Sequence, residues 1–260
     1  MSVRAIRAAV MAASLLSTIG FAGGAQATSF SIDTTVPGGS AWIDGSLGSI
    51  GGTVNVTSEN VSEGALIGRI NLHGLRSDTN AIGDLPVFCI DVGDWLGNGD
   101  FVEKPLSYFT QGTGGARVLY TSTQLQNMFK FLVYADQQGI NDTLTSAATQ
   151  LGVWEILNES GTSWDLNSGN LTVSLWSGPD AVSLANSWLG AFQSTSITNY
   201  QLHLLDPGRG NQLQAFITPG GNNNVQIPDV PEPTTWGMIV LGFGMLGSAL
   251  RRRKPEQVLV

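Results

Sequence analysis

The stretch Thr123–Gln138 reads TQLQNMFKFLVYADQQ and marks the point where the sequence changes from strand-like to helical patterning. Its apolar residues recur at the spacing of three and four that places side chains on one face of an α-helix. These residues are Leu125, Met128, Phe129, Leu132 and Val133. The hydroxyls of Thr121–Thr123 can cap the first turn, and Gly139 suits the end of the helix. The stretch therefore predicts an amphipathic helix in the middle of the chain.

Two further helices are expected after this one. Thr145–Leu157 has a broad apolar face, and Asp180–Phe192 begins with a residue that suits a helix N-cap. The apolar face of the first of them is formed by Ala147, Ala148, Leu151, Trp154 and Leu157. Three helices in succession predict a helical insert within the domain.

The rest of the body has the pattern of β-strands separated by Gly-rich turns. The predicted strands are Ser29–Ile32, Thr53–Thr57, Ala65–Leu75, Leu85–Val92, Tyr200–Leu205 and Gln212–Thr218. Strands on both sides of a helical insert predict an α+β fold, with an antiparallel β-barrel or sandwich as its body. We place this domain at residues 28–219 and a polar linker at residues 220–230.

Charge is unevenly distributed along the chain. Between Thr28 and Pro231, six Lys and Arg stand against 18 Asp and Glu, a balance of −12. Such a surface repels nucleic acid and anionic lipid and suits cations or basic partners, so we expect no nucleic-acid partner. The chain has a single cysteine, Cys89, and so cannot form an intrachain disulfide. A lone cysteine in an exported chain is buried, paired with another chain or committed to other chemistry.

The N-terminus has the order of a secretory signal peptide. Arg4 and Arg7 precede an apolar stretch at Ala8–Phe21, and Ala25–Ala27 offers a small-residue cleavage site. We therefore expect Met1–Ala27 to be removed and the remainder to be exported.

The C-terminal segment Val230–Lys254 reads VPEPTTWGMIVLGFGMLGSALRRRK. Its apolar run Trp236–Leu250 would reach only ~22 Å as a helix, short of the ~30 Å hydrocarbon core of a bilayer. Trp236 suits one membrane interface, and the four cations after the run would hold the C-terminus on the cytoplasmic side. A permanent tail anchor is one interpretation of this pattern.

The same segment resembles the PEP-CTERM sorting signal of Gram-negative bacteria. The matching residues are Pro231, Glu232, Pro233, Trp236, Gly237, Gly242, Gly244, Gly247, Arg251, Arg252 and Arg253. The resemblance implies a signal at residues 231–254 with a transmembrane helix at 236–250 and a basic tail. It also implies an exosortase-type membrane transpeptidase as partner, which cuts near Pro-Glu-Pro and releases or re-anchors everything upstream.

Two short motifs in the body carry a second resemblance. Phe88-Cys89-Ile90 ends a predicted strand, and Thr149–Trp154, which reads TQLGVW, lies in the second predicted helix. Thioester domains of bacterial surface adhesins have a similar aromatic-Cys-hydrophobic motif and a Gln followed by an aliphatic residue and Trp. The resemblance covers Ala65–Trp154. It implies an internal thioester between Cys89 and Gln150, with Phe88 and Trp154 lining its pocket.

The chemistry of a thioester explains these residue types. The Cys89 thiolate would attack the carboxamide carbon of Gln150, and ammonia would leave. Amides are poor electrophiles, but close placement of the two groups can supply ~7–11 kcal/mol of the barrier. An amine, such as a Lys side chain or an amino sugar, could then displace sulfur in a single-turnover acyl transfer. Glu155 and His73 are the candidates for a helper that activates the amine.

Cys89 and Gln150 are also compatible with purely structural roles, and an acidic loop nearby has two interpretations. Cys89 is also compatible with a small buried side chain, and Gln150 with a polar helix face. Asp91, Asp94, Asn98 and Asp100 lie on a Gly-rich loop whose oxygen ligands would suit Ca²⁺. The same residue types favour turns, and their spacing does not fit an EF-hand.

The combined expectation is an exported surface or extracellular-matrix protein that adheres to polysaccharide or to an amine-bearing surface ligand. We expect no enzymatic activity other than single-turnover thioester chemistry. The alternative is a non-covalent carbohydrate- or calcium-binding structural module of a biofilm matrix. A secreted hydrolase is least favoured, because neither a G-x-S-x-G elbow nor an H-E-x-x-H zinc motif occurs.

Overall fold

The computed structural model describes residues 30–111, 120–176, 178–208 and 212–220. The expected signal peptide at 1–27, nearly all of the expected linker at 220–230 and the sorting segment, with the helix expected at 236–250, lie outside these residues. Among the residues described, the helices are too short or too polar to cross a bilayer.

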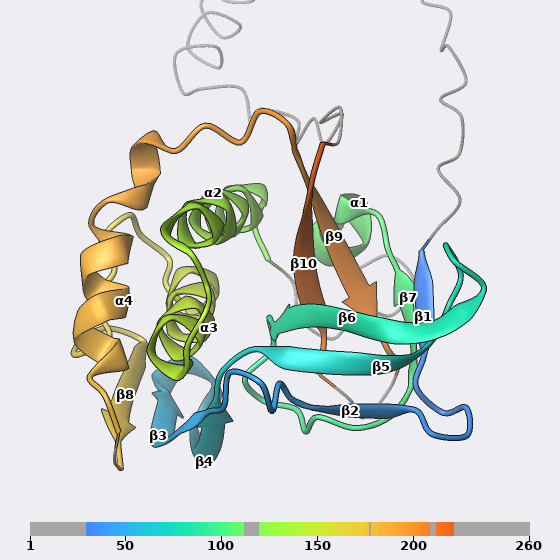
Figure 1. Ribbon diagram of the computed structural model, residues 1–260. Coiled ribbons are helices and arrows are strands. Elements are labelled where there is room, and N and C mark those ends of the chain that lie inside the picture. Colours follow the sequence, from blue (N-terminus) through green and yellow to red (C-terminus); the bar gives the residue numbers. More distant parts are fainter. Residues whose placement is uncertain (1–29, 112–119, 177, 209–211, 221–260) are drawn as a thin grey trace, which may run out of the picture.

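The body of the described chain is an antiparallel β-barrel with an additional strand (Figure 1). The strands follow one another around it in the order β1-β7-β9-β10-β6-β5, and β1 closes the ring by pairing with β5 as well as with β7. Their bounds are β1 Ser31–Asp33, β7 Asp100–Glu103, β9 Tyr200–Asp206, β10 Gln214–Pro219, β6 Ala81–Cys89 and β5 Ile70–Arg76. The extra strand, β2 (Ser40–Ile43), lies along the same edge of β5 as β1 does.

A small sheet of three antiparallel strands lies next to this barrel, in the order β4-β3-β8. Its strands are β3 Ile50–Val56, β4 Val61–Ile67 and β8 Leu171–Leu175, and the 3-10 turn η1 (Thr57–Glu59) connects the first two. The inner face of β3 buries alternate residues, as expected of a strand with one face toward a core.

The single strand predicted at Ala65–Leu75 is wrong, because the chain divides there into β4 and β5, which belong to different sheets. The break falls at Gly68 and Arg69. A Cβ at position 68 would lie 2.9 Å from the carbonyl oxygen of Gly48, so only glycine fits this close approach. The Arg69 side chain turns away to Asp44. These contacts come from elsewhere in the chain and leave no periodicity in the local sequence.

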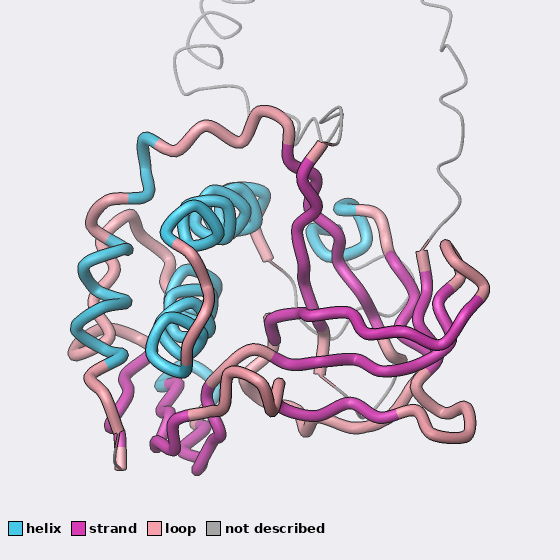
Figure 2. The backbone as a smooth tube through the Cα atoms, viewed as in Figure 1, coloured by secondary structure: helices cyan, strands magenta, loops and turns pink. Residues whose placement is uncertain are grey.

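The helices are α1 Leu106–Gln111, α2 Ser122–Gln138, α3 Thr143–Asn158, α4 Ala181–Leu189 and the 3-10 turn η2 Phe192–Ser194. Helices α2, α3 and α4 gather on one side of the barrel, whereas α1 lies apart from them near β9 (Figure 1, Figure 2). The three predicted helices correspond to α2, α3 and α4 with shifts of up to three residues at their ends, whereas α1, β2, β7 and β8 were not predicted. Helix α3 is enclosed by α2, α4 and the small sheet, and every residue from Ser146 to Leu157 is buried.

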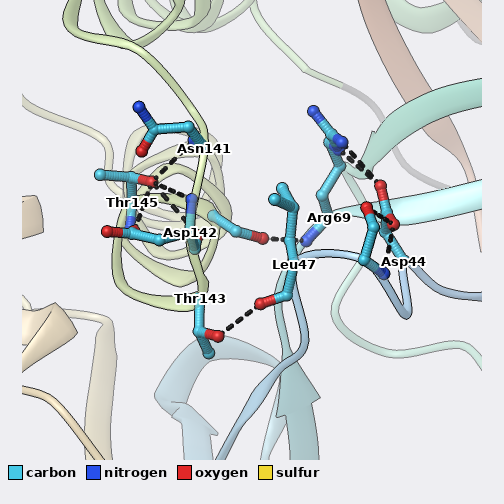
Figure 3. A network of polar contacts seen from close by, with 9 residues as sticks. Asp44, Leu47, Arg69, Asn141, Asp142, Thr143 and Thr145 are labelled. Atoms are coloured by element: carbon cyan, nitrogen blue, oxygen red, sulfur yellow. Dashed lines mark hydrogen bonds and ion pairs between the residues drawn. The ribbon is translucent and has the colours of Figure 1, made fainter.

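Polar contacts at the start of α3 hold this helix against the β-strands (Figure 3). Asp142 forms a capping box with Thr145, and the Thr143 hydroxyl donates to the Leu47 carbonyl in the β2–β3 loop. The Arg69 amide donates to the Ser146 hydroxyl at 2.7 Å, while its guanidinium pairs with Asp44 at 2.7 Å. The start of α3 is therefore tied to both sheets, which sets the position of the residues one and two turns later.

The Asp44 carboxylate is the ionic partner in this network. Burial acts to raise the pKa of Asp44, but hydrogen bonds from Ser46 and Arg69 outweigh it and leave the pKa below its ordinary value. Asp44 is therefore ionised at neutral pH and keeps its ion pair with Arg69.

Candidate functional site

Cys89 and Gln150, 61 positions apart in the sequence, are in direct contact. The Gln150 carboxamide donates from Nε2 to the Cys89 carbonyl oxygen at 2.7 Å and accepts the Cys89 amide at Oε1 at 3.0 Å. Cys89 is the last residue of β6, and the Gln150 side chain occupies the position where another strand would pair with it. Both residues are buried, with 1 % of each exposed. The structure thus brings together the two residues that the motif resemblance singles out.

The Cys89 thiol is held by the backbone of the next turn. Its Sγ lies 2.8 Å from the Asp91 carbonyl oxygen, which accepts the thiol hydrogen. Burial, and then the Asp91 charge, raise the pKa of Cys89 far above its ordinary value, and contacts with the Asp91 backbone and the Trp154 indole oppose this only in part. The group is therefore a neutral thiol at physiological pH.

Helix α3 places Trp154 one turn after Gln150, on the same side of the helix. Thr149, next to Gln150, is buried, and its hydroxyl donates to the Thr145 carbonyl at 2.7 Å. Gly152 allows close contact with α2, because a Cβ there would lie 2.0 Å from the Phe131 ring. Thr149 and Gly152 therefore each have a structural reason for their place in this helix.

A cavity of about 300 Å³ opens above these residues. Cys89, Gln150 and Trp154 line it, together with the edge of β4, the end of β2 and the loop after β6. Two tryptophans that line it, Trp42 and Trp95, are 71 % and 75 % exposed, so their rings stand at its opening to solvent.

Two carboxylates, Glu63 and Asp94, also line this cavity. The loop that carries Asp94 and Trp95 is held at several points: Asn98 accepts the Ala41 amide, and the Trp95 carbonyl accepts the Gln212 amide. The wall of the cavity formed by this loop is therefore anchored to both β2 and the segment before β10.

Phe88 does not have the place that the motif resemblance implies. It is buried on the strand next to Cys89, but it is not among the residues that line the cavity. Successive side chains of a strand point to opposite faces, so the Phe88 side chain lies on the face of β6 opposite to that of Cys89, which lines the cavity. Trp154 and the cavity walls, rather than Phe88, cover the thiol and the carboxamide.

The two proposed helpers lie elsewhere. Glu155 faces away from the cavity and accepts the Asp165 amide at 2.7 Å, and His73 pairs with Asp84 on the barrel at 2.6 Å. His203 bridges Glu103 and Thr218 across three barrel strands. None of these side chains lines the cavity that contains Cys89.

The sequence-based analysis missed four residues beside Cys89 and Gln150. Trp42, Trp95 and Glu63 line the cavity, and Tyr120, which is buried, donates its hydroxyl to the Ile90 carbonyl next to Cys89. Trp42 and Trp95 are large aromatic residues in otherwise polar, Gly-rich segments, and this contrast could have identified them as candidate binding residues. No local signal marks Tyr120, because its contact is made across 30 positions of sequence.

The acidic loop does not form the cluster expected of a carboxylate metal site. Asp91 is buried and accepts the Gly93 amide, Asn98 accepts the Ala41 amide, and Asp100 is exposed at the start of β7. Within the part of the chain that the structure describes, no three or more His, Cys, Asp or Glu side chains come close enough together to hold a metal ion.

Comparison with known proteins locates one family signature. A family model described as the PEP-CTERM protein-sorting motif matches residues 229–254. Neither a curated protein nor a solved structure shows significant similarity to the chain. The match confirms the resemblance of the C-terminal segment and covers the Pro-Glu-Pro turn, the apolar run and the basic residues. The chain therefore carries a PEP-CTERM sorting motif and is an exported protein sorted by exosortase.

Proposed function

We propose that the exported domain forms an internal thioester between Cys89 and Gln150 and uses it to attach covalently to an amine outside the cell. The observation that carries the proposal is the double hydrogen bond between the Gln150 carboxamide and the Cys89 backbone. This bond holds the amide carbon beside the cysteine in a buried site. Such placement is what an unreactive amide needs in order to become an acyl donor.

The bond-forming step balances without a further reactant. The Cys89 sulfur bonds to the Gln150 carboxamide carbon, the carbon–nitrogen bond breaks, and the thiol proton leaves on nitrogen as part of ammonia. The product has a sulfur–carbonyl bond and no free charge. Burial, which disfavours the thiolate, brings no such penalty for this product, because neither the thiol nor the thioester carries a charge.

The surroundings support a lasting thioester. Hydrolysis that expelled sulfur as a thiolate would place that charge in a site where burial and the Asp91 charge penalise it. Trp154 and the cavity walls limit the access of water to the acyl carbon. Adhesion at the cell surface or in an extracellular matrix is a role that fits such a bond in an exosortase-sorted protein.

Intact mass spectrometry of the mature exported chain tests the proposal. We expect a mass one ammonia below that of the processed sequence, and a gain of one methylamine after incubation with that amine. Cys89→Ala and Gln150→Ala should each abolish both changes, while Gln212→Ala, which alters another residue of the same cavity, should keep them. A full mass together with a thiol that reacts freely in the folded protein would refute the proposal.

A non-covalent carbohydrate-binding module is the second candidate, favoured by the two exposed tryptophans at the cavity. It predicts that polysaccharide binding is unaffected by Cys89→Ala and reversible on dilution. Covalent attachment predicts that the same variant loses all binding that survives denaturation.

A further inference from the structure

The opening of the cavity has two chemical features that narrow the choice of amine. Trp42 and Trp95 are more than 70 % exposed although they are among the largest apolar side chains, and both line the cavity that ends at Gln150. Exposed apolar rings at the opening of a pocket mark a binding surface. Their flat faces suit a ligand that is itself flat, rigid and lined with C–H groups.

Charge is the second feature. Glu63 and Asp94 line the same cavity, and no Lys or Arg is among its lining residues. The body of the chain carries a balance of −12 between Thr28 and Pro231, which adds to the negative potential at this opening. A cationic group would be attracted both to these carboxylates and to the tryptophan rings.

We propose that the acceptor is an amino sugar unit of a polysaccharide, with its pyranose ring against Trp42 and Trp95 and its ammonium group directed to Glu63 and Asp94. The proposal rests on the thioester proposed above and names its acceptor. A pyranose ring offers a C–H face to the indoles and a primary amine on a rigid frame. A lysine side chain offers the ammonium on a narrow, flexible chain of CH₂ groups, and it would contact little of the surface of the two indole rings.

Size agrees with this assignment. A cavity of about 300 Å³ stands at the lower limit of the range typical of small-molecule pockets, and it suits one sugar unit rather than a folded segment of a protein. The opening lies between β2 and the edge strand β4, so the neighbouring units of a polysaccharide chain could continue along the surface on either side.

Acyl transfer to the amino sugar proceeds through the neutral amine. The ammonium loses one proton to a carboxylate or to water, and the neutral amine attacks the carbonyl carbon of the Gln150 acyl group. The sulfur–carbon bond breaks, and sulfur takes the second proton from nitrogen to regenerate the Cys89 thiol. The product is an amide between Gln150 and the sugar.

The test measures, by intact mass, the rates at which the mature exported chain forms adducts with a glucosamine oligomer, its N-acetylated form, a lysine-containing peptide and methylamine. We expect adducts with the glucosamine oligomer and none with the acetylated form, which has no free amine. Because amines differ in basicity, the decisive quantity is the ratio of the glucosamine rate to the methylamine rate. Trp42→Ala and Trp95→Ala should each lower this ratio about tenfold.

Trp176→Ala is the matched control, since Trp176 is 62 % exposed but does not line the cavity, and it should leave the ratio unchanged. Glu63→Gln should lower the glucosamine rate and weaken its dependence on salt. An unchanged ratio in both tryptophan variants, or a lysine-peptide rate that falls as much as the glucosamine rate in them, would overturn the amino-sugar assignment. If instead the ammonia deficit and the methylamine adduct are themselves missing, the thioester proposal fails, and this failure is distinct from the first.

Discussion

At the scale of single residues, the described domain places an ionisable side chain where water cannot reach it. Glu155 on α3 is fully buried, its Oε1 accepts the Asp165 amide, and its Oε2 has no hydrogen-bond partner among the residues described. Burial raises the pKa of Glu155 to about 8, and the nearby Glu159 and Asp165 charges add to the rise. The side chain is therefore neutral at physiological pH, and it stabilises the loop after α3 as a hydrogen-bond acceptor.

The raised pKa predicts how stability depends on pH. Below the ordinary pKa of 4.5, Glu155 is protonated in both states and costs nothing. As pH rises from there toward 8, the unfolded chain loses this proton while the folded one keeps it, so stability falls, by up to ~1.4 kcal/mol per pH unit. Glu155→Gln keeps the shape without the charge and should remove this slope. The gain should be small at pH 5 and on the order of a few kcal/mol at pH 8.

Urea unfolding of the unaltered protein and of Glu155→Gln between pH 5 and pH 8 measures this change of stability with pH. Glu59→Gln, which alters an exposed carboxylate, should retain the slope of the unaltered protein. Parallel pH profiles for Glu155→Gln and the unaltered protein would show that Glu155 is ionised in the folded state.

At the scale of elements, α3 connects the candidate site to the rest of the core. Its first turn is tied to the β2–β3 loop and to Arg69, its middle carries Gln150 and Trp154, and its far side packs against α2. Phe131 of α2 lies over Gly152 and also stacks edge-on with Phe192, at 5.6 Å between ring centroids. A shift of α3 against α2 would therefore also move Gln150 relative to Cys89.

Gly152→Ala should destabilise the domain, although alanine is the better helix former. The new methyl group would lie 2.0 Å from the Phe131 ring, and the helices must separate to accept it, at a cost of roughly 1–3 kcal/mol. Thermal unfolding measures the loss. Gly161→Ala provides the control, because a Cβ there meets its nearest neighbour at an ordinary 3.8 Å. Equal melting temperatures for the two variants would contradict the packing argument.

The cap of α3 gives a second prediction at this scale. Asp142 accepts the Thr145 amide at 2.7 Å, and this bond lowers the pKa of Asp142. Asp142→Ala should lower the free energy of unfolding, and Asp142→Asn, which can still cap, should lower it less. Urea unfolding at neutral pH checks the order of the two variants; the reverse order would show that the cap contributes little.

At the scale of the whole molecule, the described domain and the sorting motif have separate tasks. The barrel and helices build the cavity, whereas residues 229–254 determine where the protein is sent. The acidic composition of the domain, with its exposed tryptophans, is compatible with the exported location that the motif indicates.

Replacing both prolines of the motif tests the sorting. Pro231→Ala with Pro233→Ala should leave the chain unprocessed and retained with the membrane fraction. Cell fractionation and the mass of the exported product measure this. Pro228→Ala, which lies just before the matched residues, should be processed normally. Normal processing of the double variant would show that the transpeptidase does not recognise the two prolines.

The sequence by itself determined the features that depend on residues close together in the chain. The 3.6-residue periodicity of α2, the threonine cap before α2 and the sorting motif each lie within a short stretch of chain, and each was predicted correctly. The pairing of Cys89 with Gln150 was also inferred from two motifs, and the structure brings these residues into contact.

Only the tertiary structure decided what depends on segments that are distant in sequence. The closure of the barrel through β1 and β5 and the break between β4 and β5 follow from pairings that no local pattern encodes. The cavity is the clearest case, because its walls come from β2, β4, the loop after β6 and α3, and neither Trp42 nor Trp95 is marked in the sequence as its neighbour. Periodicity records which face of an element is buried, but which elements face each other is settled by packing the whole chain at once.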